Sequence, residues 1–597
     1  MPSLPELACR LRIRAANVSL YARNLAAITR TPPAATARRI RCTAFLFAAL
    51  SCTLAFAPTA AAAAGAPARP ALVLVIAVDQ FRGDYLARFG PHFGTGGLRL
   101  LLEQGANFID CRYRHSITKT ACGHAVILTG VHANVHGIIN NAWVERETLK
   151  RVNCVDDDGV QILGRSADQG GARLPAGTTS LGASPRRLLA TTVGDELKQT
   201  RNARSKVIGI SSKDRSAILL AGKLADAAYW MDKGRIVTST HYMPRLPAWV
   251  EAFNQTGRID AYFGRTWDRI LPAAVYEELL GPDDVPGEST EWGLARTFPK
   301  IVNGGAEKIG PVFYDAFECS PFKSEVLADF ARAVVENEKL GQRGVTDLLC
   351  LSFSANDTVG HNYGPGSHEV MDITLRTDRL IADFLGFLDG RIGLKNCTIV
   401  FTADHGTPPI PERLKAINAA ISSGRIDNVR VLKTCEAALD RAFGSLGEGR
   451  HWLLLDESSL LFLRDVLKEK NVTAAAAENV VRGALLTLEF VEAAYTRTDL
   501  AAGRVTGEYG GAMLLSFNAA RSGDVYYQMK PYWVDRKSGT NHGSPYNYDT
   551  HVPLLWFGVG VQPGTYAQRV GVEDIAPTLA HILGLPPPPM SQGRVLF

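Results

Sequence analysis

The sequence predicts an α/β protein in which a mostly parallel central sheet lies between helices. Three features indicate this class: short apolar runs, helix-like stretches between them, and polar residues directly after the runs. The apolar runs are residues 71–78, 206–211, 347–353, 397–403 and 552–558. Because both faces of each run are apolar, the runs suit central strands that are covered on both sides. Helix-like stretches at 95–105, 185–199 and 375–390 alternate with them, as in an α/β sandwich.

The length and composition are those of a large globular protein. Of its 597 residues, 46% are apolar and 21% are charged, so the chain can bury a sizeable core. Two stretches, about 217–340 and about 407–540, fit the alternation of strands and helices poorly. We expect them to be insertions that cap the active site within one catalytic domain of residues 65–597.

Residues 1–64 have the features of a secretory signal with a long basic region. Eight arginines precede the apolar stretch CTAFLFAALSCTLAFA, which leads into small residues. The stretch is short for a spanning helix, so we expect cleavage near Ala61 to Ala64 and a periplasmic or secreted protein without stable membrane association. Removing eight arginines and one glutamate changes the formal net charge from +6 to −1. The basic balance of the full chain therefore does not indicate a nucleic-acid partner.

Seven cysteines remain after the predicted cleavage. They are Cys111, Cys122, Cys154, Cys319, Cys350, Cys397 and Cys435. An odd number leaves at least one thiol unpaired unless it bonds to another chain. Cys350 and Cys397 lie in strand-like runs, where buried thiols are expected. The pairing stays open at this point, and we expect a monomer.

Polar clusters follow four of the apolar runs. They are Asp79, Ser212-Lys213-Asp214-Arg215, Asn356-Asp357 and Asp404-His405. In open α/β sheets the ligand site lies beyond the carboxyl ends of the strands, so we expect these clusters to form one site. His361 and the late stretch NHGSPYNYDTH (541–551) add imidazoles. Carboxylates and imidazoles without thiolates suit zinc in a catalytic site that keeps positions open.

The stretch TKTACGHAVILTG (118–130) contains the candidate nucleophiles. Cys122 followed by His124 would suit a thiol hydrolase. Thr120, just before an apolar helical run, could be an ordinary N-cap or an alkoxide nucleophile held by a metal ion. The residues of this stretch alone leave the three interpretations open.

Seven stretches carry a specific resemblance to a known family. They are VDQFRGDYL (78–86), TKTACGHAVILTGVHANVHGIINN (118–141), SSKDRSA (211–217), SANDTVGHNYGPGS (354–367), TADHGTP (402–408), GTNHGSPYNYDTHVPL (539–554) and VEDIAPTLAHILGLP (572–586). In this order they resemble the alkaline phosphatase superfamily, in the branch of phosphate-irrepressible alkaline phosphatases and nucleotide pyrophosphatase/phosphodiesterases. The resemblance implies an alkaline phosphatase-like fold from about residue 71 to the C-terminus.

The resemblance also implies two zinc ions per chain. One would be held by Asp357, His361 and His542, and the other by Asp79, Asp404, His405 and the nucleophile Thr120. His542 is favoured over His551 as a ligand, because NHGS is a glycine-flanked turn that can approach a metal. His551 enters the following strand instead.

The activity implied by the resemblance is hydrolysis of small phosphate monoesters by an exported alkaline phosphatase, through a threonyl-phosphate formed on Thr120. Asn141 matches the asparagine that donates to a phosphoryl oxygen. Lys213 and Arg215 match the pair that contacts the terminal oxygens of a monoester, where charge-assisted hydrogen bonds favour a dianion. Cys122 is then expected to be a small buried residue.

Other interpretations of the sequence remain. The three histidines His124, His132 and His136 are expected to be structural. A phosphodiesterase or nucleotide pyrophosphatase would keep the same metal ligands and the same threonine. A secreted zinc- or phosphate-binding protein without turnover is a remote alternative, because the sequence lacks none of the expected ligands.

Overall fold

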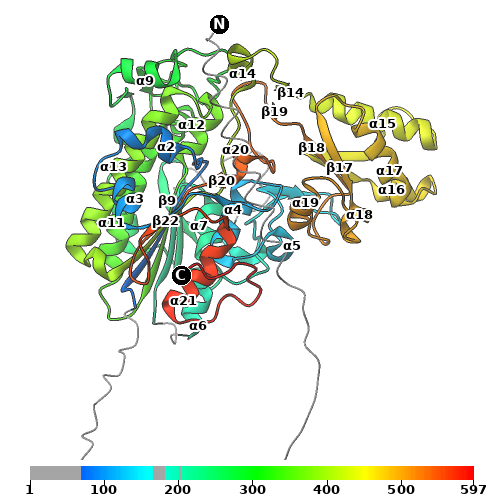
Figure 1. The fold of residues 1–597 in the computed structure, drawn as a ribbon. Helices are drawn as coiled ribbons and strands as arrows, with labels where there is room; N and C mark the ends of the chain where they lie inside the picture. Colours follow the sequence, from blue (N-terminus) through cyan, green and yellow to red (C-terminus); the bar gives the residue numbers. More distant parts are fainter. Residues whose placement is uncertain (1–68, 166–181, 201–203) are drawn as a thin grey trace, which may run out of the picture. The chain divides into compact units, whose positions relative to one another are not determined.

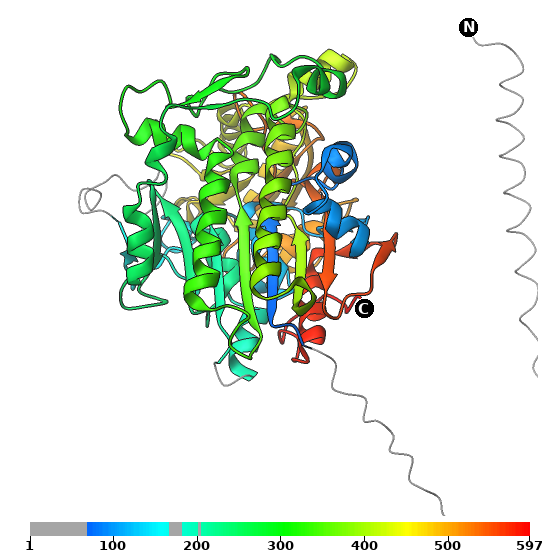
Figure 2. The same cartoon turned by 90° about the vertical axis from the view of Figure 1, so that its left-hand side faces the viewer.

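The computed structural model describes residues 69–165, 182–200 and 204–597, all within one compact unit, Gly65–Phe597. The predicted signal and its cleavage site lie outside the described residues. The unit is built on a ten-stranded sheet (Figures 1 and 2). In spatial order its strands are β22 (Gly564–Tyr566), β2 (Ala106–Phe108), β21 (Leu554–Gly558), β13 (Cys397–Thr402), β1 (Leu72–Val78), β12 (Asp347–Phe353), β7 (Val207–Ser211), β8 (Ala227–Asp232), β9 (Arg235–Ser239) and β6 (Ile162–Leu163).

The middle of the sheet is parallel. β1 pairs in parallel with β12 and with β13, and β7 pairs in parallel with β12 and with β8. β21 runs antiparallel to β13, so the sheet is mixed towards that side. The five predicted runs all form strands of this sheet, which confirms the α/β class. The carboxyl ends of the parallel strands therefore meet at one edge.

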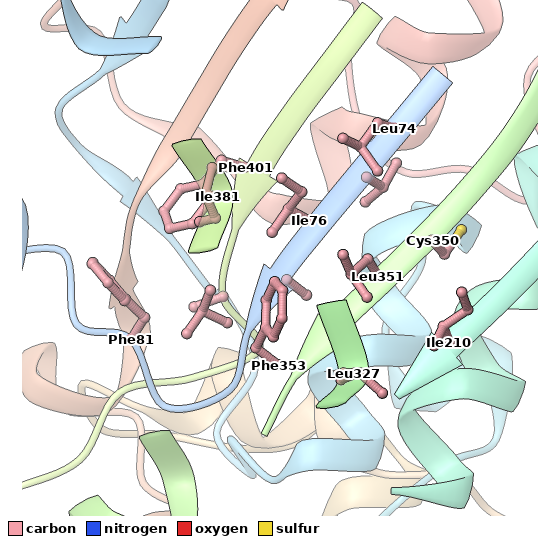
Figure 3. Close-up of a cluster of buried hydrophobic side chains, with 14 of the residues drawn as sticks. Leu74, Ile76, Phe81, Ile210, Leu327, Cys350, Leu351, Phe353, Ile381 and Phe401 are labelled. Atoms are coloured by element: carbon pink, nitrogen blue, oxygen red, sulfur yellow. The ribbon is translucent and has the colours of Figure 1, made fainter. Parts of the chain in front are cut away.

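Helices cover both faces of the parallel strands. α11 (Phe322–Glu338) and α13 (His368–Arg391) lie over one face, and α4 (Thr120–Thr129), α7 (Asp214–Ala221) and α21 (Ile575–Leu583) lie over the other (Figures 1 and 2). Every residue of β1 and β12 is buried, as expected for strands covered on both sides. Leu351 of β12 and Phe401 of β13 share one hydrophobic cluster with Leu327 of α11 and Ile381 of α13 (Figure 3).

The expected insertion of about 217–340 needs correction. Its first part contains β8 and β9, which belong to the central sheet, and its last part contains α11, which covers that sheet. β8 (AAYWMD) and β9 (RIVTS) form an antiparallel hairpin. The apolar part of β8, AAYWM, is five residues long, and that of β9 is shorter, so the pattern alone does not distinguish these strands from a short buried helix segment.

The second expected insertion contains a separate lobe, defined here as residues 424–534 and coloured yellow to orange in Figure 1. Its four-stranded antiparallel sheet has the order β15 (Leu453–Asp456), β16 (Ser459–Phe462), β18 (Val525–Met529) and β17 (Val491–Thr496). Helices α15 (Asn428–Phe443) and α17 (Ala474–Leu485) contribute to a hydrophobic cluster of its own around Trp452. The lobe therefore has an internal core and is more than a surface loop.

The seven cysteines predicted to remain in the mature chain are all buried. None of them forms a disulfide in the described part of the chain. No helix among the described residues is long and apolar enough to cross a membrane.

A buried polar cluster lies beside α12 (Ala355–Tyr363). Lys300 Nζ lies 2.9 Å from Glu369 Oε1, and both side chains are fully buried. Lys300 also lies over the ring of Tyr363 in α12. Glu288 is 6% exposed, and neither of its carboxylate oxygens has a hydrogen-bond partner within the described ranges. Burial, and then the nearby Glu369 carboxylate, raise the pKa of Glu288 to about 9.

Glu288 should contribute stability that is lost as the pH rises from about 5 to about 9, and Glu288→Gln should remove this contribution. The folded chain keeps the Glu288 proton up to a pKa of about 9, whereas the ordinary value is 4.5. Within this window the Glu288 side chain binds more protons in the folded state than in the unfolded state, so its contribution to stability falls as the pH rises. Urea unfolding at several pH values measures the slope, with the exposed Glu278→Gln as control. An unchanged slope in Glu288→Gln would contradict the assignment.

Candidate metal centre

Four strands bring the predicted site residues to one edge of the sheet. Asp79 directly follows β1, Asp404 follows β13, Asp357 lies in the first turn of α12 after β12, and Lys213 follows β7. The three carboxylates are buried, with Asp79 and Asp404 fully covered and Asp357 4% exposed. The parallel order of the strands thus collects negative charge where water has little access.

The rings of the three predicted histidine ligands are each held by a backbone carbonyl. The Nδ1 atom of each ring is within hydrogen-bonding distance of a backbone carbonyl: 2.9 Å for His361, 3.0 Å for His405 and 2.7 Å for His542. A carbonyl oxygen only accepts, so each Nδ1 carries the proton that it donates. In a neutral ring the Nε2 lone pair is then available to a metal, the arrangement usual for metal-binding histidines.

Two groups of ligand atoms are close enough to hold metal ions. Asp357, His361 and His542 form one group, and Asp79, Asp357 and His405 form the other. The ligand atoms within each group lie within 4.8 Å of one another. Asp357 belongs to both groups, so the two possible ion positions are adjacent.

Asp404 lies beside the second group. Its Oδ2 and the Oδ1 of Asp79 are each 3.4 Å from His405 Nε2. Neither oxygen has a well-formed hydrogen bond to any of the described residues, although both are buried. A buried carboxylate oxygen without a donor is unfavourable unless a cation binds it. Such oxygens beside imidazole nitrogens fit a divalent metal such as zinc.

Lys213 supplies positive charge to the same carboxylates. Its Nζ lies 2.6 Å from Asp79 Oδ2 and 2.6 Å from Asp357 Oδ2. Burial and the Asp357 charge would each raise the pKa of Asp79, but Lys213, together with His405, lowers it below its ordinary value. Burial and Asp79 raise the pKa of Asp404. An ammonium has three N–H donors, so two carboxylate contacts leave one donor for another acceptor.

Thr120 is the first residue of α4. Its side chain is buried, and Oγ1 lies 3.4 Å from His405 Nε2. Ala121 N donates to Asn141 Oδ1 at 2.8 Å, which leaves the Asn141 amide nitrogen as a donor. The free N–H groups and dipole at the start of a helix favour an anion. Arg215 adds a buried Nε without a hydrogen-bond partner in the described chain.

Comparison with known proteins places this arrangement in a family. The family described as type I phosphodiesterase / nucleotide pyrophosphatase matches residues 73–446. Alkaline phosphatase PhoV from Synechococcus elongatus is 35% identical over 533 residues, covering 89% of this chain and 92% of PhoV. The chain belongs to the type I phosphodiesterase / nucleotide pyrophosphatase family.

Proteins named alkaline phosphatase PafA are also similar to this chain. PafA from Elizabethkingia meningoseptica is 30% identical over 536 residues, covering 88% of this chain and 94% of PafA. A crystal structure of wild-type PafA matches with a TM-score of 0.80 and 30% identity, covering 89% of this chain and 99% of that chain. A second structure, with a TM-score of 0.80 and 29% identity, is titled as a PafA variant in which a threonine, an asparagine, a lysine and an arginine are replaced.

The structure disfavours the thiol interpretation of the TKTACGHAVILTG stretch. Cys122 is buried, and burial raises its pKa to about 12, so the thiol stays protonated. Both nitrogens of His124 lie near other partners: Nδ1 is 2.8 Å from Thr120 O, and Nε2 is 2.8 Å from Ser352 Oγ. His124 Nδ1 is also 3.1 Å from Asp404 Oδ2. His124 therefore holds Asp404 and the start of α4 in position and is not a base for Cys122.

His132 and His136 are also buried, and neither belongs to the two metal groups. His132 Nδ1 lies 3.3 Å from His115 Nδ1, and His132 Nε2 lies 3.6 Å from Glu573 Oε1. His136 Nδ1 accepts a hydrogen bond from Ile138 N. Because these contacts join other side chains and the backbone, they are typical of structural residues.

Gln80 is a site residue that the sequence analysis missed. Its backbone N–H donates to Asp404 Oδ1 at 3.1 Å, and its side-chain Nε2 donates to Asp357 Oδ1 at 2.7 Å. Its backbone is left-handed, with φ of +66°, an uncommon conformation for a residue other than glycine. A Cβ on Gly360 of α12 would lie 1.8 Å from Gln80 Oε1, so this close approach requires glycine. The position of Gln80 directly after Asp79 is the signal that could have identified it.

Asp549 is a second missed residue. Its Oδ2 accepts hydrogen bonds from the backbone N–H groups of Gly543 at 3.0 Å and Ser544 at 2.8 Å. Its own carbonyl accepts from Gly406 N at 2.7 Å. Asp549 thereby joins the loop that carries His542 to the loop that carries His405. Its place in the NHGSPYNYDTH stretch was the available signal.

The geometry favours His542 over His551 as the predicted ligand. His542 Nε2 lies 3.6 Å from Asp357 Oδ1. The ring of His551 instead packs against Gly83, and its Nε2 lies 3.1 Å from Ile109 O. His551 is therefore directed at the backbone and not at the carboxylates.

His542→Ala should weaken binding of one metal ion, whereas His551→Ala should leave metal binding unchanged. Outer-shell changes already cost roughly 10- to 100-fold in metal affinity, so loss of a ligand should cost at least that much. Zinc titration by calorimetry and metal content by mass spectrometry measure the effect on each purified variant. Loss of an ion in His551→Ala with retention in His542→Ala would reverse the assignment.

Proposed function

We propose that this protein is a zinc-dependent alkaline phosphatase that hydrolyses phosphate monoesters through a threonyl-phosphate intermediate. The observation that carries the proposal is the position of Thr120, whose hydroxyl faces His405 at the buried start of α4. Relatives over most of the chain are named alkaline phosphatases. The residue types replaced in the PafA variant have the same order as the four predicted here, Thr120, Asn141, Lys213 and Arg215. The separation within the threonine–asparagine pair and within the lysine–arginine pair is also the same.

The donor set supports two zinc ions per chain. Asp357, His361 and His542 would hold one ion, and Asp79, Asp404, His405 and Thr120 would hold the other. When bound, the two ions would lower the pKa of the Thr120 hydroxyl and offset the charge on the phosphate and on the leaving oxygen.

The protein residues have distinct roles in the proposed reaction. Thr120 Oγ forms a bond to phosphorus while the ester oxygen–phosphorus bond breaks. Water then breaks the bond between Thr120 and the phosphoryl group and releases inorganic phosphate. The Asn141 amide nitrogen, Arg215 Nε and the remaining Lys213 N–H would donate hydrogen bonds to the non-bridging oxygens. Donors that the fold already orients need no rearrangement when charge develops on the phosphoryl oxygens.

The proposed substrates are small phosphate esters, and we propose no nucleic-acid partner. Residues 1–64 support export to the periplasm or the medium, followed by signal cleavage. We propose a monomer without stable membrane association after cleavage.

A phosphodiesterase or nucleotide pyrophosphatase is the second candidate function. The description of the matching family names these activities, and such an enzyme would use the same ligands and the same threonine. The donors around the phosphate distinguish the two, because a monoester dianion has one more charged oxygen than a diester. Lys213 and Arg215 therefore favour the monoester.

Thr120→Ala should abolish the phospho-enzyme and lower monoester turnover by about 10³-fold or more, as the loss of a nucleophile does in other hydrolases. Cys122→Ala should keep most of the activity, because its thiol is protonated and has no base. Rapid-quench labelling with a phosphate ester and steady-state rates measure both variants. Full turnover in Thr120→Ala, or lost turnover in a folded Cys122→Ala, would overturn the assignment of the nucleophile.

Arg215→Ala and the double variant Lys213→Ala/Arg215→Ala should lower monoester kcat/KM more than diester kcat/KM. Each charge-assisted contact is worth roughly 1.5–3 kcal/mol, so the double variant should lose on the order of a hundredfold for monoesters. Metal content must be measured in parallel, because Lys213 also contacts two proposed ligands. The monoester to diester ratio at fixed pH and saturating zinc decides the question. An unchanged ratio would make the diesterase the preferred function.

A further inference from the structure

The structure assigns a positioning role to Glu457, at the tip of the turn between β15 and β16 of the lobe. We infer that its carboxylate holds the nucleophile Thr120 and the donor Asn141 at a fixed separation. The inference rests on the proposed function of these two residues. Through this role the inserted lobe contributes to catalysis, although its residues lie far from Thr120 and Asn141 in the sequence.

One oxygen of Glu457 contacts the residue before each of the two proposed catalytic residues. Glu457 Oε2 lies 3.2 Å from Nζ of Lys119, which precedes Thr120. The same oxygen accepts a hydrogen bond at 3.1 Å from Nδ2 of Asn140, which precedes Asn141. Two segments of the catalytic domain are thereby joined through a single carboxylate from the lobe.

Two further hydrogen bonds continue this connection to the proposed catalytic groups. Asn141 N donates to Asn140 Oδ1 at 2.8 Å, so the Asn140 side chain that binds Glu457 also fixes the Asn141 backbone. Ala121 N donates to Asn141 Oδ1 at 2.8 Å, which ties the Asn141 side chain to the first turn of α4. A displacement of Asn140 would therefore move the Asn141 amide relative to Thr120.

The turn that carries Glu457 is itself held against the catalytic domain. Glu457 has a left-handed backbone, with φ of +54°, and its carbonyl accepts a hydrogen bond from Tyr527 Oη of the lobe at 3.3 Å. The preceding residue, Asp456, accepts from Val144 N at 2.9 Å and pairs with Arg151. Side chain and backbone contacts thus fix the turn from both sides.

The charges of Glu457 and Lys119 match this positioning role. Burial would raise the pKa of Glu457, but the Lys119 ammonium lowers it below its ordinary value. Burial would lower the pKa of Lys119, but Glu457 raises it. The pair is partly exposed, with 11% of the Lys119 side chain and 28% of the Glu457 side chain accessible. Removing Glu457 therefore weakens the compensation of the Lys119 charge without abolishing it, because Asp535 and Asp549 also act on Lys119. The Lys119 side chain also passes beside Gly543, next to the proposed ligand His542, so a displaced Lys119 would disturb that side of the site.

The test compares Glu457→Gln and Glu457→Ala with the wild type, and repeats each change in an Asn141→Ala background. Misplacement of reacting groups costs up to about 10²-fold, so we expect monoester kcat/KM to fall about tenfold in Glu457→Gln and further in Glu457→Ala. In the Asn141→Ala background the same changes should cost clearly less than in the wild type, because the part of the loss that acts through the Asn141 amide is already gone. At saturating zinc, the zinc content and the unfolding midpoint should match the wild type, because all the proposed ligands are retained.

The matched control is Glu489→Gln, which removes an exposed ion pair with Arg430 in the same lobe and should leave activity unchanged. Equal losses from Glu457→Gln with and without Asn141→Ala would show independent effects and overturn the positioning role. Activity losses that follow zinc content or the unfolding midpoint would also overturn it. A folded, zinc-loaded wild type without phosphatase activity would overturn the proposed function and this inference with it. An active wild type with additive losses would overturn this inference alone.

Discussion

The carboxylates of Asp79, Asp357 and Asp404 are buried together, and the local structure is organised around the need to compensate their charge. Parallel strands with helices on both faces leave their carboxyl edge as the place where polar groups converge. Because water cannot screen these charges, protein groups must do so. Lys213 contacts Asp79 and Asp357, and Gln80 donates to Asp357 and Asp404. The oxygens that these contacts leave without donors are those that fit a divalent cation.

The lobe bears on a second requirement of the site, a fixed distance between the nucleophile and the phosphate donor. Displacement at phosphorus requires a nucleophile and a phosphate donor at fixed positions, and Thr120 and Asn141 belong to different segments. A rigid element outside both segments can hold them, and the lobe has a hydrophobic core of its own to make it rigid. Through Glu457 the lobe contacts the residue preceding each of them. We therefore assign the lobe a positioning role in place of the cap over the active site that the sequence predicts.

Much of the fold and most of the site residues could be predicted from the sequence, for a physical reason. A strand buried on both faces must be a continuous apolar run, so β1, β7, β12 and β13 have strong local signals. The topology then gathers the residues that follow them. The apolar runs of β8 and β9 are short, and a short run alone does not distinguish a strand from a buried helix segment, so their place in the sheet depends on their neighbours. Gln80, Asp549 and Glu457 act through contacts between distant segments, so their roles do not follow from the local sequence, although Gln80 and Asp549 lie close in sequence to predicted ligands. Lys213 was expected at the phosphate, and its two carboxylate contacts likewise depend on the assembled edge.

The anchoring of the histidines explains why the nucleophile, the ligands and the lobe should behave as one unit. His361 Nδ1 donates to Thr540 O, and Thr540 N donates to His361 O at 2.8 Å, so α12 fixes the loop that reaches His542 two residues later. His542 Nδ1 in turn donates to Thr118 O, two residues before Thr120. The His542 bond is buried and the His361 bond partly buried, and such bonds resist deformation because breaking one leaves a polar group with little access to water unpaired. A shift at Lys119 would therefore reach His542 as well as Thr120. Fixing Lys119 through Glu457 would then stabilise the geometry of the ligands and of the nucleophile together.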